Sequence, residues 1–400
     1  MDEIDRYIAA TRRSLPDLAS SEMYKSHKKI VDSVLFSVTS PTEMRVFYTS
    51  ERRSEYLEIN DISVICYDQY LGQTLSNFAR LTFDSDSTEF TLNYISKVLA
   101  EFFRAYGASR EAFVFARIHS DEEYKLRKLP RKSRKRLISV FYQELFLMTH
   151  EAYHAVLRKS PVLRHSAHEV VNRYFANVES RKRKLGTDQE AETLSPSRAD
   201  IEPDLIDEMI CDFYAYAVVV GTARNKLVFG KNEKDIAALG CFAALKNIQL
   251  VNALRASVVA HVRKKDVTDR TRMDFLSHQH NVRARFMNWL CNNIVGGVDK
   301  PIGTIVGDID DYLNKYHDNL ATLTYSMCET VVSGKLFSVF REEFEHVDQI
   351  EVMRNMDFRE RVAVVDVMTG WHSKPEVAVR TQKLLNDPTK IRRLLRPGPQ

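Results

Sequence analysis

The residues of this chain with the clearest potential for chemistry are two histidines and a glutamate in one short segment. Residues 150–154 read His-Glu-Ala-Tyr-His. Positions four apart share one face of a helix, so the imidazoles of His150 and His154 can reach a single ion. Glu151 then lies beside the ion rather than on it, where a general base must sit to take a proton from water. Because imidazole is a good zinc ligand, the segment predicts a zinc site with Glu151 as the catalytic base.

The residues around this motif favour the functional interpretation. The motif lies within 137–158, which is apolar nearly all round and predicts a buried helix. Burying histidine and glutamate there without partners would cost free energy. The alternative is that both histidines are satisfied core side chains and that Glu151 is a partly exposed carboxylate.

A catalytic zinc also needs a third protein ligand and an open fourth position. A third histidine six residues after the second is excluded, because Ser160 stands there. The later segment DEMICD places Glu208 and Asp212 one helical turn apart. We expect Glu208 to bind the metal and Asp212 to accept the free ring N–H of a ligand histidine. Alternatively, these acids form a solvent-facing stripe together with Asp204.

HEAYH followed by a helix carrying EMICD resembles the gluzincin metallopeptidases, in which two helices supply His-Glu-x-x-His and Glu-x-x-x-Asp. The resemblance implies that His150, His154 and Glu208 are metal ligands, that Glu151 is the base and that Asp212 supports a ligand. It also implies a sheet before the active helix, whose edge strand binds an extended substrate. The long interval between His154 and Glu208 is similar to that in phage-exclusion-type cytosolic peptidases.

A further segment, SHQHNVRARF at 277–286, resembles the part of such peptidases that supplies a histidine and an arginine after the glutamate helix. A cationic or N–H-bearing side chain aimed at the site would stabilise the oxyanion of a tetrahedral intermediate. The residues that the resemblance brings forward for this role are His278, Arg283 and Arg285. His280, Tyr216 and His317 are alternatives, and a polar helix start with no catalytic role is another.

The elements that must position these residues are mostly helices. Segments 44–50 and 56–68 are dense in β-branched and aromatic residues, with Asn60-Asp61 as a predicted hairpin tip. Residues 113–118 are compatible with one more strand. Apolar residues at three- and four-residue spacing predict helices elsewhere, at 88–107, 137–158, 160–180, 204–221, 234–262, 281–295 and much of 309–345. We therefore expect an α+β fold, mostly α-helical, with a small N-terminal β-sheet packed before the active-site helix.

The expected domain organisation has three parts. Residues 1–136 form an N-terminal α/β region, 137–345 a helical metallopeptidase core with a flexible insertion at about 181–203, and 346–400 a C-terminal helical tail. The run 125–136 holds eight lysines or arginines in twelve positions. No aromatic residues are interspersed, so we interpret it as a solvated segment. The alternative is a docking surface for acidic or nucleic-acid partners.

Composition limits the class of protein. Fifty-eight Lys and Arg against 54 Asp and Glu give a net charge of only +4, which makes a nucleic-acid partner unlikely. The five cysteines form no CxxC pair, which excludes zinc-finger and redox motifs. With neither a secretory signal nor a membrane span expected, we predict a cytoplasmic protein.

The sequence predicts a zinc metallopeptidase that binds one zinc ion per chain and acts on a protein or peptide substrate. The alternatives are a zinc hydrolase of a non-peptide bond, and a non-catalytic helical interaction protein with a structural metal site and a basic docking patch.

Overall fold

The structure is a computed structural model, and its mostly helical α+β architecture confirms the predicted fold class. It describes most of residues 24–293 and one later helix; the described residues are 4, 6, 7, 24–35, 42–47, 52–84, 88–123, 134–185, 198, 201–225, 227–229, 233–263, 268–293, 318–333 and 364. Everything below refers to these residues. The chain divides into two compact units, of which the first holds 1–79, 134–249 and 275–312 and the second holds 80–133, 250–274 and 313–400.

A three-stranded sheet lies in the first unit. Strand β3 (Ile62–Asp68) is central, β1 (Thr42–Phe47) pairs with it in parallel, and β2 (Ser54–Ile59) pairs with it antiparallel. The β2–β3 hairpin turns at Asn60 and Asp61, whose φ angles of 49° and 63° are those a two-residue type I′ turn requires. The predicted hairpin tip is therefore confirmed. Among the described residues only β3 pairs with β2, which leaves β2 at the edge of the sheet.

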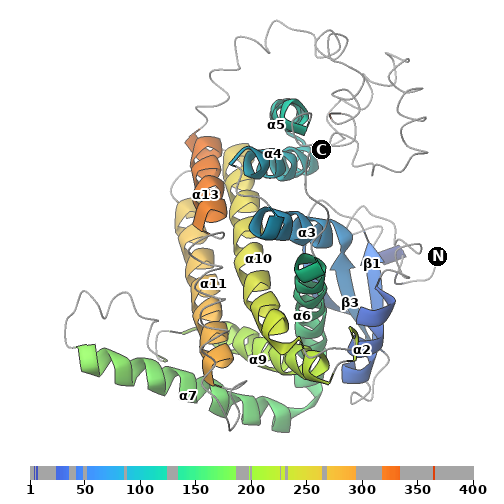
Figure 1. Cartoon of the computed structure of the whole chain (residues 1–400), viewed down its shortest axis with the longest axis vertical. Coiled ribbons are helices and arrows are strands. Elements are labelled where there is room, and N and C mark those ends of the chain that lie inside the picture. Colours follow the sequence, from blue (N-terminus) through green and yellow to red (C-terminus); the bar gives the residue numbers. More distant parts are fainter. Residues whose placement is uncertain are drawn as a thin grey trace, which may run out of the picture. The chain divides into compact units, whose positions relative to one another are not determined.

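The central strand explains why the sheet packs as it does. Every residue of β3 after Ile62 is buried, as expected for a strand covered on both faces. Val64 and Cys66 pack into a small core with Phe47 and Ile59, while Tyr67 reaches the opposite side and donates a hydrogen bond to Glu144. Glu144 belongs to α6 (Arg134–Lys159), which packs against β2 and β3 (Figure 1).

Four more helices pack on α6 or on its neighbours in the first unit. Helix α2 (Lys25–Leu35) and helix α9 (Pro203–Arg224) pack on α6, and α7 (Pro161–Leu185) packs on α9. Tyr174 of α7 meets Phe286 and Trp289 of α11 (Thr268–Asn293) in an aromatic cluster. Helix α7 therefore contacts both α9 and α11.

The second unit is helical throughout its described residues. Helices α4 (Thr88–Ala105) and α5 (Ser109–Glu123) pack closely together, and the rings of Phe103 and Phe115 stack between them. Helix α13 (Asp318–Ser333) packs on α4. The expectation of a strand at 113–118 is wrong, because this apolar run forms the buried face of α5. A short apolar run has no period of its own, so tertiary packing decided its conformation.

Three described helices contribute to both units, namely α3 (Gln69–Asp84), α10 (Lys234–Arg263) and α11. Helix α3 follows β3 directly, and α10 is the longest described helix. By length and composition α10 could cross a membrane, but 72% of its most apolar window is buried inside the protein. A buried core helix passes the same test, so we assign α10 to the core.

Several predicted features lie partly or wholly outside the described residues. Helix α7 continues through Leu185, so the first residues of the predicted insertion are helical, and 186–197 lie outside the described part. Residues 125–133 of the basic run also lie outside it, as does His317. The same is true of 346–400 except for Val364.

Candidate metal centre

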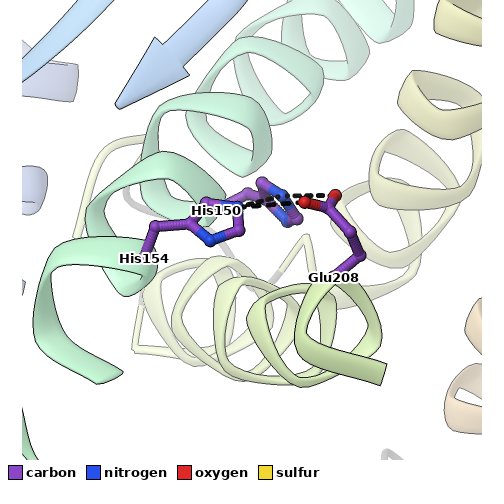
Figure 2. Close-up of side chains that lie close together, drawn as sticks. All are labelled: His150, His154 and Glu208. Atoms are coloured by element: carbon purple, nitrogen blue, oxygen red, sulfur yellow. Dashed lines mark hydrogen bonds and ion pairs between the residues drawn. The ribbon is translucent and has the colours of Figure 1, made fainter. Parts of the chain in front are cut away.

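Three side chains from two helices converge in the first unit (Figure 2). His150 and His154 project from α6, and Glu208 projects from α9. His150 Nε2 lies 3.2 Å from Glu208 Oε2, and His154 Nε2 lies 3.3 Å from Glu208 Oε1. The two Nε2 atoms are 3.2 Å apart. The group of His150, His154 and Glu208 can therefore hold a metal ion.

The spacing of these atoms fits a small tetrahedral ion. Ligands about 2.0–2.1 Å from a tetrahedral centre are about 3.3–3.4 Å from one another. The distance of 3.2 Å between the two Nε2 atoms is close to this length, as are the distances of 3.2 and 3.3 Å from these nitrogens to the two oxygens of Glu208. The donor set of two imidazoles and one carboxylate is also one that zinc accepts.

Asp212 contacts His150 at Nδ1, the ring nitrogen that does not face Glu208. It lies one turn after Glu208 on α9 and is completely buried, with Oδ1 2.9 Å from Nδ1 of His150. This contact fixes the ring so that Nε2, the other nitrogen, faces Glu208. The predicted pairing of Asp212 with a ligand histidine therefore matches the geometry.

Arg283 of α11 holds both acids of α9. Its Nε and Nη2 donate hydrogen bonds of 2.8 Å to the two oxygens of Asp212, and its Nη1 lies 2.7 Å from Glu208 Oε2. The side chain of Arg283 is largely buried. Every nitrogen of the guanidinium thus contacts a carboxylate, so the role suggested for Arg283 in stabilising an oxyanion stays a prediction.

Neighbouring charges shift the pKa values of the side chains at the centre. Burial tends to lower the pKa of His150, but the carboxylates of Glu208 and Asp212 outweigh it and raise this pKa to about 10. Burial tends to raise the pKa of Glu208, but Arg283 and His150 hold it well below its usual range. The pKa of Asp212 is lowered against burial in the same way, by Arg283 and His150. Both side chains are therefore ionised near neutral pH and can bind a cation.

Glu151 lies next to the centre and is attached to the sheet. Its carboxylate accepts a hydrogen bond from the backbone N–H of Tyr56 in β2. Burial raises the pKa of Glu151, against the opposing effect of the two histidines. A carboxyl group with a raised pKa, beside the ligands and not among them, is suited to accepting and returning a proton.

The centre is open on one side. The side chain of His150 is 5% exposed, whereas those of His154 and Glu208 are 26% and 34% exposed. Solvent can therefore approach the group on the side of His154 and Glu208. An open side is what distinguishes a catalytic metal site from a closed structural one.

Other residues predicted for the site lie elsewhere. His278 and Arg285 are exposed on α11, whereas Arg283 on the same helix reaches the ligands. Tyr216 and His280 are buried side chains. The sequence interpretation missed Cys211, whose Sγ lies 3.5 Å from Nδ1 of His154. Its only sequence signal is its place between Glu208 and Asp212.

Comparison of the chain with protein families, with curated proteins and with solved structures finds no match. Any functional proposal therefore depends on the geometry of the centre and on the motif resemblance.

Proposed function

We propose that the protein is a zinc-dependent metalloendopeptidase, with His150, His154 and Glu208 as the zinc ligands and Glu151 as the general base. The observation that supports this most directly is the triangle of ligand atoms with Glu151 beside it. Zinc in such a ligand set supplies Lewis acidity, which polarises a carbonyl and makes water easier to deprotonate near neutral pH.

The charges of the side chains favour a divalent cation. The carboxylates of Glu151, Glu208 and Asp212 surround the centre, and Arg283 places one positive charge against them. With all three carboxylates ionised and both imidazoles neutral, two negative charges remain. A divalent cation balances them, and the imidazoles favour zinc over magnesium or calcium.

The residues of the chain then have distinct tasks. Glu151 accepts a proton from the water that attacks the peptide carbonyl carbon, and returns it to the leaving amine nitrogen as the C–N bond breaks. Asp212 keeps the ring of His150 in place. Edge strand β2 lies beside this base, and an extended peptide can add along it as a further strand.

Peptidase function is best tested by comparing new protein termini in cells that express the wild type or Glu151→Gln. Glu329→Gln, a change at an exposed glutamate of α13, is the matched control. We expect new termini with the wild type and the control, and none with Glu151→Gln. The purified Glu151→Gln protein should still bind about one zinc per chain, because no ligand is lost.

The same comparison discriminates the alternatives. Zinc at full occupancy without termini that depend on Glu151 would favour a hydrolase of a non-peptide bond or a structural metal site. Purified protein that contains no metal and takes up none would exclude all three.

A further inference from the structure

The second ligand histidine has an unusual partner. Nε2 of His154 faces Glu208 Oε1, and its other ring nitrogen, Nδ1, faces Sγ of Cys211 at 3.5 Å. Cys211 is completely buried on α9. A ligand histidine usually donates its second N–H to a carboxylate, a backbone carbonyl or a water. Here a thiol occupies that place.

Cys211 does not lie where a metal ligand would. Its sulfur contacts Nδ1 of His154, whereas Nε2 of the same ring faces Glu208. Within the described part of the chain, the donors that converge on one point are those of His150, His154 and Glu208. The sulfur can therefore act on the ion only through the ring of His154.

Side chains on one face of α9 therefore contact both histidines. Positions 208, 211 and 212 are neighbours on a helix surface, because residues three and four apart lie together. Glu208 faces the space between the two imidazoles, Asp212 lies behind His150, and Cys211 lies behind His154. The two supports differ in chemistry, since Asp212 presents a carboxylate to His150 and Cys211 presents a sulfur to His154.

We propose that Cys211 is a positioning residue for His154: its sulfur accepts the Nδ1–H and so directs the Nε2 lone pair at the metal. This inference depends on the metal centre of the proposed function. A neutral acceptor suits the position, because a third buried carboxylate on this face of α9 would repel Glu208 and Asp212. Sulfur is a weak acceptor, so His154 is held less firmly than His150.

The test is the zinc affinity of purified variants, measured by competition with a chromophoric chelator. Cys211→Ala should weaken zinc binding by about tenfold, the low end of the range for such supporting contacts. Cys211→Ser should bind more tightly than Cys211→Ala, because a hydroxyl oxygen also accepts a hydrogen bond. Cys241→Ala, at a completely buried cysteine of α10, is the matched control and should bind as the wild type does.

Two results would overturn the proposal while leaving the metal centre intact. One is a Cys211→Ala protein that binds zinc as tightly as the Cys241→Ala control, although His150→Ala abolishes binding. The other is a Cys211→Ser protein no better than Cys211→Ala, which would reduce the role of Cys211 to filling space. A wild type that binds no zinc would instead refute the proposed function, and this inference with it.

A spectroscopic measurement on the wild type needs no variant to fold. The Co²⁺-loaded protein should show ligand-field bands of a tetrahedral site without the intense near-ultraviolet band of a thiolate bound to cobalt. A strong thiolate-to-cobalt band that Cys211→Ser removes would make Cys211 a ligand and overturn its positioning role.

Discussion

The guanidinium of Arg283 and the carboxylate of Asp212 meet edge to edge, with Nε and Nη2 each 2.8 Å from a different carboxylate oxygen. Such a two-point contact fixes the plane of the carboxylate as well as its position. Because Asp212 also contacts Nδ1 of His150, the arginine on α11 orients a histidine on α6 through an acid on α9. Three helices are therefore linked in one chain of polar contacts.

This relationship predicts strong coupling between the two residues. Arg283→Met leaves the buried carboxylate of Asp212 and the partly exposed carboxylate of Glu208 without their cation, and it should lower the free energy of unfolding by about 3–5 kcal/mol. The double variant Asp212→Asn/Arg283→Met should lose less than the sum of the single changes, by about 1–3 kcal/mol. Urea denaturation of the four proteins in a double-mutant cycle measures this, and strict additivity would contradict it.

Of the acidic residues near the centre, Glu208 is the one whose loss should remove the bound zinc. Glu208→Ala takes away a donor atom, so both bound zinc and activity should be lost. Elemental analysis of the purified protein measures this, with Glu329→Ala, a change at an exposed glutamate of α13, as the control. Full zinc content in Glu208→Ala, with loss in a variant of Glu169, Glu179 or Glu202, would show that the third ligand was misassigned.

Asp212 should affect the metal without binding it. Asp212→Ala should weaken zinc binding by about 10–100-fold, since His150 loses the contact that orients its ring. Chelator competition gives the affinity, and circular dichroism of the metal-free protein shows whether the fold is kept. An affinity equal to that of the wild type would mean that the contact at Nδ1 has no influence on the centre.

The buried carboxyl group of Glu144 should make stability depend on pH. It accepts hydrogen bonds from Tyr24 and Tyr67, yet burial raises its pKa from 4.5 to about 7. The folded state therefore binds this proton more tightly than the unfolded state. Its contribution to stability is full below pH 4.5 and is lost as the pH rises through 7, a change of about 3 kcal/mol.

Glu144→Gln removes this titration and isolates its effect. The stability of the variant relative to the wild type should rise by about 3 kcal/mol between pH 4.5 and 8. Chemical denaturation at a series of pH values gives both curves. Parallel curves for the two proteins would show that Glu144 titrates alike in the folded and unfolded states.

Two glycines offer a matched test of packing beside the same group. A β-carbon added to Gly72 of α3 would collide with the carboxylate of Glu144 and the hydroxyl of Tyr24, whereas one added to Gly221 of α9 meets nothing nearby. Gly72→Ala should destabilise the protein by about 1–3 kcal/mol. Gly221→Ala should stabilise it by up to about 1 kcal/mol, because alanine favours a helix. Thermal unfolding measures both, and equal shifts would contradict the packing argument.

Local patterns in the sequence accounted for part of the fold. The hairpin followed from its β-branched strands and from Asn60-Asp61, and the helices bearing His150 and Glu208 followed from their apolar spacing. The run at 113–118 was misread because an apolar segment of that length suits a buried helix as well as a strand. The pairing of β1 with β3 in parallel could not be predicted, since it joins strands that are not consecutive.

The candidate site was likewise predicted only in part from the sequence. Spacing within a helix indicated His150, Glu151 and His154, and it placed Glu208 one turn from Asp212. Spacing within a helix could not predict the contacts between helices. Arg283 was one of several candidates on α11, and only the packing of α11 on α9 shows which one meets the acids. The approach of Cys211 to His154 likewise depends on how α9 turns toward α6.

The ligands come from two helices that are far apart along the chain, and this has a consequence for the protein's response to its surroundings. An ion shared by His154 on α6 and Glu208 on α9 acts as a reversible cross-link that closes the segment 155–207 into a loop. If the ion is zinc, as we propose, folding stability would follow the free zinc concentration by mass action, with about 2.7 kcal/mol gained at a hundred times the dissociation constant. The lifetime of this chain in a cell would therefore be set in part by zinc supply.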